Sequence, residues 1–439
     1  MKRTPKFVIS SILSIFITPV FADSADLLSL YQHAENYDAD IFAAQSAYLA
    51  EQQGESLAFA GLLPSLNADV SAGRTNSNSD LNRDDSYKTL NYALSLTQPL
   101  FNLSSWHDVS SSEQNTLRAQ AVYLSAQQNL ILNVASAYFD VLRGQENLRS
   151  DQSQEAAVKR QYEQAKEQFD VGLIAITDVH EAKASYDSSQ TSRIRSEGNL
   201  TIAVETLSRI TGQFTSELHT LKASFPVAVD DKTSAEQWVE SAFNHNLDIK
   251  IADYNLKTLE AQLQVNRAQH LPTLDLRASY NTSKLTNSHA RNDAPEESAI
   301  SLNLNIPLYS GGATQAGVRQ TRFLIEQAKH QLTSAQRQAR IEARTEYINI
   351  KTNVQTVESL QQNIVSRESA LEATREGYKV GTRNIVEVLD AERSYFTALK
   401  DYANARFDFV ESNLRIRRSA GTLNVNDLQE INNWLVPSE

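Results

Sequence analysis

The chain presents the same series of sequence features twice, displaced by 208–209 residues. Pro64 and Pro99 lie 35 residues apart, and Pro272 and Pro307 repeat that spacing. The neighbouring residues repeat with the same displacement: Leu63-Pro64-Ser65-Leu66 matches Leu271-Pro272-Thr273-Leu274, Phe169-Asp170-Val171-Gly172 matches Tyr378-Lys379-Val380-Gly381, and Thr211-Gly212 matches Ala420-Gly421. A near-constant displacement over most of the chain predicts two structural repeats, so each element found once is expected again.

In each repeat the two prolines bracket the strand-like sequence. The apolar residues that alternate with polar ones are Leu90, Tyr92, Leu94 and Leu96 in the first repeat and Ile300, Leu302, Leu304 and Ile306 in the second. Alternation with period two gives a strand one apolar and one polar face. About ten such residues, when tilted, span a bilayer with the apolar face in lipid. Two soluble hairpins with a half-buried face fit the same alternation.

The segments before these strands, 66–73 and 274–281, alternate less regularly and are expected to be their partners. Polar, charged sequence separates the members of each pair, so long outer-surface loops are predicted over 74–86 and 282–297.

The remainder is predicted to be helical. Residues 100–225 and 308–436 lack proline, which otherwise interrupts helices. Residues 104–169 would form one helix of about 100 Å at 1.5 Å per residue. Gly172 and Gly381 mark reversals of the chain. Steps of three, four and seven residues relate Ile385, Leu389, Phe396, Leu399, Ala403, Val410 and Leu414, which favours a coiled coil over a globular core.

The N-terminus has the pattern of a secretory signal over residues 1–22. Three cations precede a short apolar stretch, and Val20-Phe21-Ala22 offers small residues for cleavage. A retained membrane anchor is the alternative. Cleavage would change the formal net charge from −12 to −15, and an acidic chain does not fit nucleic-acid binding. Because the chain has no cysteine, disulfides and thiolate chemistry are excluded.

Four strands cannot close a membrane barrel, since single-chain barrels begin at about eight. Open edges in lipid would leave backbone groups without hydrogen bonds. The chain is therefore expected to associate through its strands. A dimer with eight strands and a trimer with twelve both satisfy this requirement.

The whole chain after the signal resembles the TolC family of outer-membrane channels, which serve tripartite efflux pumps and type I secretion. The motifs that carry the resemblance are the segments 169–179, 271–276, 307–312 and 378–390. The resemblance implies a trimer, a twelve-stranded membrane β-barrel and a long α-helical coiled-coil barrel that tapers through the periplasm to a closed tip. It also implies an equatorial region at mid-length.

On this basis the chain is divided as follows: signal peptide 1–22, start of helical repeat one 23–63, first strand pair 64–101, periplasmic helices of repeat one 102–212, equatorial region 213–234, start of helical repeat two 235–271, second strand pair 272–309, periplasmic helices of repeat two 310–421, and a C-terminal equatorial segment 422–439.

The resemblance also implies a gate at the closed tip. Tyr378 and Arg383 match the family's gate positions in the second repeat, and Asp178, with Thr177 beside it, matches their partner in the first. An arginine fork and a tyrosine hydroxyl can both donate to one carboxylate. The alternative is that these residues are ordinary solvated side chains in helical turns.

Glu387 and Asp390 lie one helical turn further on and share a helix face. The family has acidic rings at these positions, usually aspartate at both, so Glu387 is a departure. Three copies of each would favour cations in a narrow throat, and capture of a multivalent cation at Glu387 and Asp390 is possible. A solvated acidic helix face is the alternative.

Catalytic motifs are absent from the sequence. The eight histidines are scattered without metal-ligand spacing, and Gly311-Gly312 lacks the Gly-Lys-Ser/Thr of a phosphate loop. No Gly-x-Ser-x-Gly motif occurs. We therefore expect neither an enzyme nor a cofactor.

The expected partners follow from the resemblance. They are two further copies of the chain, outer-membrane lipid, a periplasmic adaptor protein and an inner-membrane pump of the RND, ABC or MFS type. The sequence does not choose among substrates or pumps. A soluble periplasmic coiled-coil scaffold with two incidental hairpins is the rival from another class.

Overall fold

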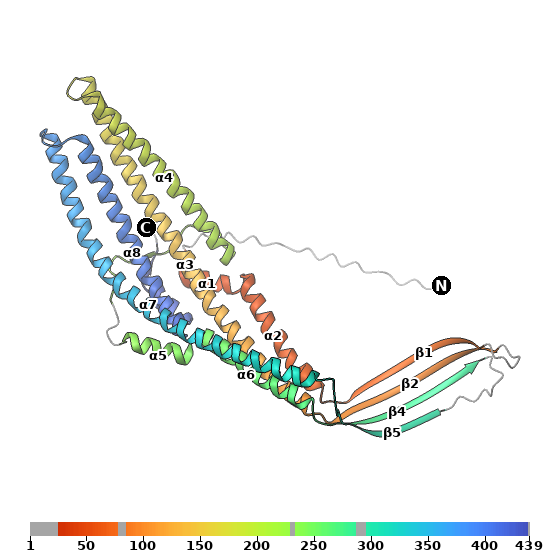
Figure 1. The fold of residues 1–439 in the computed structure, drawn as a ribbon. Coiled ribbons are helices and arrows are strands. Elements are labelled where there is room, and N and C mark those ends of the chain that lie inside the picture. Colours follow the sequence, from red (N-terminus) through yellow and green to blue (C-terminus); the bar gives the residue numbers. More distant parts are fainter. Residues whose placement is uncertain (1–24, 78–84, 229–232, 287–295, 438–439) are drawn as a thin grey trace, which may run out of the picture.

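The computed structural model describes residues 25–77, 85–228, 233–286 and 296–437. The predicted signal peptide lies outside the described residues. The described chain is elongated, with a strand region at one end and paired helix ends at the other (Figure 1). None of the helices in these ranges combines the length and hydropathy that crossing a membrane requires.

The elements repeat in the order that the sequence predicts. The first repeat comprises α1 (Leu27–Glu35), α2 (Ala39–Ala60), β1 (Ser65–Ser77), β2 (Asp85–Phe101), α3 (Leu103–Asp170) and α4 (Ile176–Thr211). The second comprises α5 (Ala235–His245), α6 (Leu247–Ala268), β4 (Thr273–Thr286), β5 (Glu296–Asn305), α7 (Ala313–Lys379) and α8 (Ile385–Ser419). The prediction of two copies of each element is confirmed.

The four long strands form one antiparallel sheet in the order β1-β2-β4-β5. Pairing of β2 with β4 joins the two repeats, which leaves β1 and β5 as open edges. The predicted loops were too long, because β1 continues to Ser77, β2 starts at Asp85, β4 continues to Thr286 and β5 starts at Glu296. What remains of these loops lies outside the described residues.

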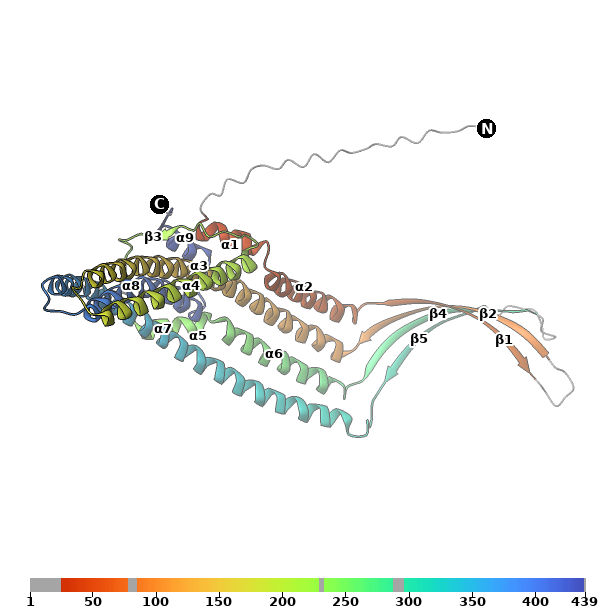
Figure 2. The same cartoon turned by 90° about the horizontal axis from the view of Figure 1, so that it is seen from above.

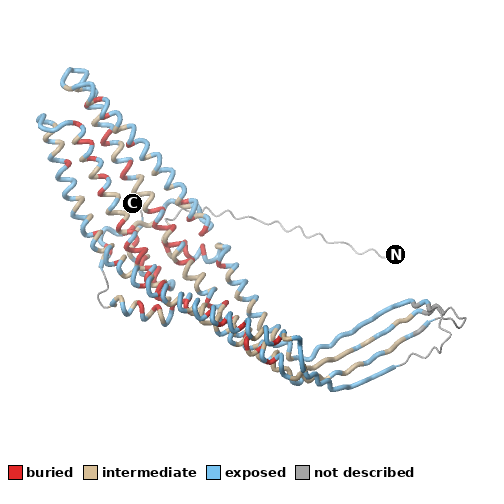
Figure 3. Tube along the Cα trace, in the orientation of Figure 1, coloured by how far each residue is buried: buried red, intermediate tan, exposed pale blue. Residues whose placement is uncertain are grey.

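The register places the apolar sets of all four strands on one face. Leu66 pairs with Leu96, which pairs with Ala278, which pairs with Ile300. The opposite face carries polar residues, and there Ser283 Oγ donates to Asn91 Oδ1 at 2.6 Å. Figure 3 shows that the strands are exposed or intermediate along the single chain. The sheet therefore has the two faces that a membrane barrel needs, one for lipid and one for water.

The long helix predicted over residues 104–169 is confirmed as α3, and α7 is its counterpart in the second repeat. α3 has 68 residues and α7 has 67, which correspond to about 100 Å each. Seen from above, α2, α3, α6 and α7 continue the order of the strands as one layer (Figure 2). Asn102 caps α3 by accepting from the Ser105 backbone N–H at 3.2 Å, an arrangement that satisfies a free amide of the first turn.

The main buried core lies at mid-length, where the burial is concentrated in Figure 3. Here the short strand β3 (Thr220–Leu221) pairs with β6 (Leu435–Val436), and helix α9 (Val425–Asn432) lies nearby. The hydroxyl of buried Tyr138 on α3 donates to the His219 carbonyl at 2.6 Å. These contacts attach the short elements to the long helices.

Candidate functional site

The two helical reversals lie together at the end of the molecule far from the sheet (Figure 1). Gly172 and Gly381 have φ values of 79° and 76°, in the left-handed region that favours glycine. A small buried cluster from both repeats lies behind them: Val158, Ala165, Ala182, Ile385 and Leu389. The reversals of the two repeats are therefore packed into one unit, here called the tip.

Tyr378 connects the two repeats at the tip. Its half-buried ring packs against the tip cluster, and its hydroxyl donates to Gln168 Oε1 on α3 at 3.1 Å. Burial raises the pKa of Tyr378, and the nearby charge of Asp178 raises it further. The sequence analysis missed Gln168, although it directly precedes the Phe169 motif. Within the described residues no hydrogen bond or ion pair joins Tyr378 or Arg383 to Asp178.

Arg383, in the turn between α7 and α8, instead pairs with the first turn of α8. Its Nη1 donates to Glu387 Oε2 at 2.5 Å, and its side chain is 58% exposed. A Cβ added to Gly377 would come within 2.7 Å of Arg383 Cγ, so the glycine makes room for the arginine to fold against the end of α7. Asn384 caps α8 and accepts from the Glu387 backbone N–H at 2.9 Å.

Thr177 and Asp178 lie in the first turn of α4. Thr177 is exposed and Asp178 is partly exposed. A carboxylate in the first turn is favoured by the partial positive charge of a helix N-terminus. The structure thus brings Asp178 close enough to influence Tyr378 electrostatically without a direct bond.

Both carboxylates of the predicted acidic ring are paired with arginines of the same chain. Glu387 is bonded to Arg383, and Asp390 accepts from Arg393 Nη1 at 3.2 Å. The hydrogen bond from Arg383 lowers the pKa of Glu387. Each acid therefore carries a neighbouring positive charge that the sequence analysis did not consider.

A partly buried ion pair beside the tip was not predicted either. Glu392 on α8 is 0% exposed, and its Oε1 accepts from Arg375 Nη2 on α7 at 2.6 Å. The other oxygen, Glu392 Oε2, has no hydrogen-bond partner. Arg375 lies one turn before Tyr378 on the same helix. The sequence gives no signal for this pair, because the two residues meet only through the register of α7 against α8.

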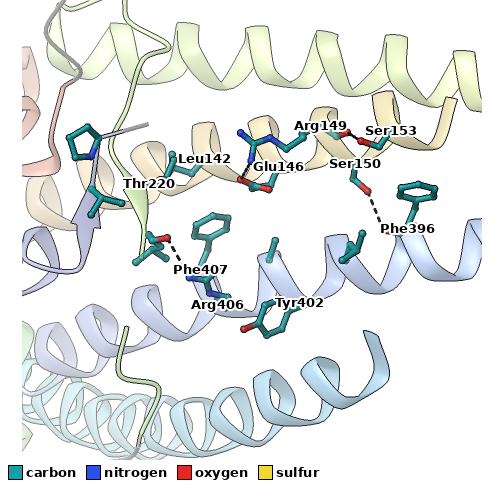
Figure 4. Close-up of a pocket in the computed structure, with 15 residues that line it drawn as sticks. Leu142, Glu146, Arg149, Ser150, Ser153, Thr220, Phe396, Tyr402, Arg406 and Phe407 are labelled. Atoms are coloured by element: carbon teal, nitrogen blue, oxygen red, sulfur yellow. Dashed lines mark hydrogen bonds and ion pairs between the residues drawn. The ribbon is translucent and has the colours of Figure 1, made fainter. Parts of the chain in front are cut away.

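A cavity of about 790 Å³ lies at mid-length between α3 and α8 (Figure 4). Arg406 crosses it toward β3, donates to the Lys222 carbonyl, and stacks on the rings of Phe225 and Tyr402 at 5.0 and 5.7 Å. Burial lowers the pKa of Arg406. The lining includes neither histidine nor cysteine, and no acid and histidine cluster in the described ranges has the arrangement of a metal site.

The model of the family described as "Outer membrane efflux protein" matches residues 30–213 and, separately, residues 238–422. The chain belongs to the outer membrane efflux protein family. The two matches coincide with the two repeats of this efflux protein. Its fold combines the long helices of a helical barrel with a strand region that forms part of a membrane β-barrel.

Individual relatives agree with the family match. Outer membrane protein TolC of Vibrio cholerae serotype O1 is 34% identical over 98% of both chains. The proteases secretion protein PrtF of Dickeya chrysanthemi is 28% identical over 94% of this efflux protein and 92% of its own length. The solved CmeC outer membrane channel of Campylobacter jejuni has a TM-score of 0.77 at 17% identity, covering 93% and 90% of the two chains.

The efflux protein is thus an outer-membrane exit duct for efflux or secretion, and its family consists of channel proteins and not of enzymes.

Proposed function

We propose that the efflux protein works as a trimer whose tip is closed at rest and is opened by an adaptor and an inner-membrane pump. The observation that carries the proposal is the tip itself, where polar links at Tyr378 and Arg383 lie over a cluster of only five buried residues. The duct is passive. Energy comes from the pump, of the RND, ABC or MFS type.

The open sheet edges support a trimer. Because the outer edges of β1 and β5 are open, copies must join edge to edge to satisfy the backbone groups of these edges in lipid. A dimer would give eight strands, and the interior of an eight-stranded barrel is largely filled by side chains. Twelve strands leave room for exported cargo. The division of the chain into strand pairs, periplasmic helices and equatorial segments, with the bounds given from the sequence, belongs to this proposal.

The gate is weak enough to be opened by a partner. A net contribution of about 1 kcal/mol per hydrogen bond gives about 3 kcal/mol for three copies of the Tyr378–Gln168 link, which keeps the open state below about 1%. In the proposed opening, Tyr378 and Arg383 release the inner helices, while Thr177 and Asp178 anchor the opposite reversal. A partner that prefers the open state about 10⁴-fold would overcome the gate.

Apolar residues exposed at the tip support a docking partner. Val171, Leu173 and Val380 are 71–74% exposed beside the two reversals. Exposed apolar groups gathered at one end of a chain mark an interaction surface. We propose that the adaptor packs there and along the outer coiled coils, and that the pump delivers substrate through it.

The assembly is tested by native mass spectrometry of the detergent-extracted protein. Three copies of the mature chain are expected in the complex. A complex of two copies, or a monomer in every mild detergent tried, would overturn the trimer.

The contribution of Glu387 to cation selectivity is expected to persist to low pH. The pKa of Glu387 lies below its ordinary value of 4.5 because Arg383 donates to the carboxylate. A carboxyl group with a depressed folded-state pKa stabilises the structure above 4.5, and that contribution is lost as the pH falls through the lower folded-state value. The carboxylate of Glu387 also keeps its negative charge until the pH falls below about 4.5. The ratio of cation to anion permeability should therefore stay constant from pH 7 to 5 and fall only below about pH 4.5.

Glu387→Gln is the matched variant for this measurement. It should lower selectivity at pH 7 and remove part of the acid-dependent change. A fall in selectivity between pH 7 and 5 in the unmodified protein would contradict the assignment of Glu387.

A further inference from the structure

Three arginines surround a cleft between α6 and α7, next to the sheet. Arg267 lies in the last turn of α6, and Arg319 and Arg322 lie within the first three turns of α7. The cleft has a volume of about 530 Å³, and the buried residues Leu263 and Ile325 line it. We call it the arginine cleft.

A hydrogen bond beside the arginine cleft joins the two helices that form it. Asn266 Nδ2 on α6 donates to Thr321 Oγ1 on α7 at 2.8 Å. This bond, together with the packing of Leu263 and Ile325, fixes the spacing of the two helices. The arginines are therefore held around a formed depression.

The charge of the cleft is not balanced within the chain. Arg267, Arg319 and Arg322 make no hydrogen bond or ion pair with any side chain in the described ranges, although the chain has a net charge of −12. The acid that lines the cleft, Glu326, is bonded to Lys329 at 2.8 Å. Three positive charges thus remain around one apolar depression, an arrangement that attracts an anion.

Further from the sheet, helix α5 packs against the face of α7 that borders the arginine cleft. Arg340 and Arg344 lie 18 residues, or five turns, beyond Arg322 and Glu326. Arg340 stacks on an aromatic ring of α5 at 5.3 Å, and Arg344 donates to Glu236 of α5 at 3.2 Å. Helix α5 must lie on the outer wall of the duct, because a helix on the inner wall would obstruct the lumen. The arginine cleft then opens outward as well, a step that rests on the proposed duct.

The arginine cleft lies near the level of the membrane surface. Arg267 precedes β4 by only six residues. Leu308 and Tyr309, between β5 and α7, are 93% and 86% exposed, as expected for residues at the boundary between hydrocarbon and headgroups. Arg319 and Arg322 follow the start of α7 by about 9–14 Å. Long arginine side chains can extend from there toward the headgroup layer.

We propose that the arginine cleft binds the phosphate of an anionic phospholipid in the periplasmic leaflet of the outer membrane. The guanidinium groups would hold the phosphate oxygens through charge-assisted, forked hydrogen bonds. Leu263 and Ile325 lie further from the sheet than the arginines along α6 and α7 and would form the floor of the cleft below the phosphate, while the acyl chains would extend toward the sheet. Bound lipid would tie the upper end of the helical barrel to the membrane.

The test is native mass spectrometry of the detergent-extracted complex titrated with phosphatidylglycerol and, separately, with phosphatidylcholine. The unmodified protein should prefer phosphatidylglycerol. Each arginine near an anionic headgroup contributes about fivefold in affinity, so Arg267→Gln combined with Arg322→Gln should lower the affinity for phosphatidylglycerol about 25-fold. Both side chains are exposed, so the variant is expected to fold.

The matched control is Arg195→Gln combined with Arg337→Gln, two exposed arginines outside the cleft. It removes the same charge and should leave the affinity unchanged. Equal losses in both double variants, or no preference between the two lipids, would overturn the proposal. Displacement of phosphatidylglycerol by inorganic phosphate at equal concentration would assign the cleft to a free anion and would also overturn it. Channel conductance, measured separately, shows whether the duct itself is intact.

Discussion

Gly421→Ala is expected to lower the free energy of unfolding by about 3 kcal/mol or more. The loss arises where the C-terminal end of α8 packs against the junction of α5 and α6. Gly421 has φ 71°, and a Cβ there would lie 2.2 Å from the His245 carbonyl oxygen and 2.7 Å from the Asn246 nitrogen. These neighbours are all backbone atoms of one peptide unit, so no flexible side chain can move aside. The substitution would also disturb the adjacent bond from Asn246 Nδ2 to the Ser419 carbonyl, which is 2.8 Å long and buried.

Gly381→Ala provides the comparison for this effect. Gly381 has φ 76° but nothing within 4 Å of an added Cβ, so only the conformational cost of about 1–2 kcal/mol applies. The apparent melting temperature of the oligomer, followed by tryptophan fluorescence, should fall much further for Gly421→Ala. Equal melting temperatures in the two variants would show that the close approach at Gly421 is not a constraint.

Arg375→Ala is expected to loosen the tip, because it leaves the carboxylate of Glu392 buried without its partner. Removing one member of a buried ion pair costs about 3–5 kcal/mol. The lower end applies here, since the Arg375 side chain is 41% exposed. The lost partner, Arg375, lies one turn from Tyr378, so the destabilisation affects the tip. The variant channel should therefore open more often in single-channel recordings than the unmodified protein.

The double variant Arg375→Met with Glu392→Leu separates charge from packing. Replacing both members of a buried pair with apolar residues of similar size is often neutral or stabilising. Closed-state lifetimes should therefore return toward those of the unmodified protein. If Arg375→Ala alone leaves the lifetimes unchanged, the pair does not contribute to closure.

The repeat and the element order could be predicted because they depend on local patterns. Alternation with period two identifies the strands around Leu94 and Ile300, and the spacing of prolines sets the limits of the helices. The loops were predicted too long because polar residues within the outer ends of the strands resemble loop sequence. Ser71, Asn91 and Ser283 show the same chemistry inside the sheet, where they bond to one another across strands.

The candidate site was only partly predictable. Its location at the two reversals follows from the glycine motifs, and the resemblance identifies Tyr378 and Arg383. The partner of the tyrosine, Gln168, depends on the register between helices, whereas Glu387, the partner of the arginine, lies only four residues further along the chain, a spacing that the sequence does show. Single-sequence patterns do not give the register between helices, which is also why they give no signal for the pair of Arg375 and Glu392.

Single-channel conductance in a planar bilayer tests the gated duct most directly, with the unmodified protein beside Tyr378→Phe combined with Arg383→Ser. We predict small, long-lived, cation-selective steps for the unmodified protein. Loss of the three Tyr378 links alone should raise the open population about 100-fold, so the double variant should show larger conductance. Channels of identical conductance in both proteins would contradict the gate, and no insertion by either correctly assembled protein would contradict the duct itself.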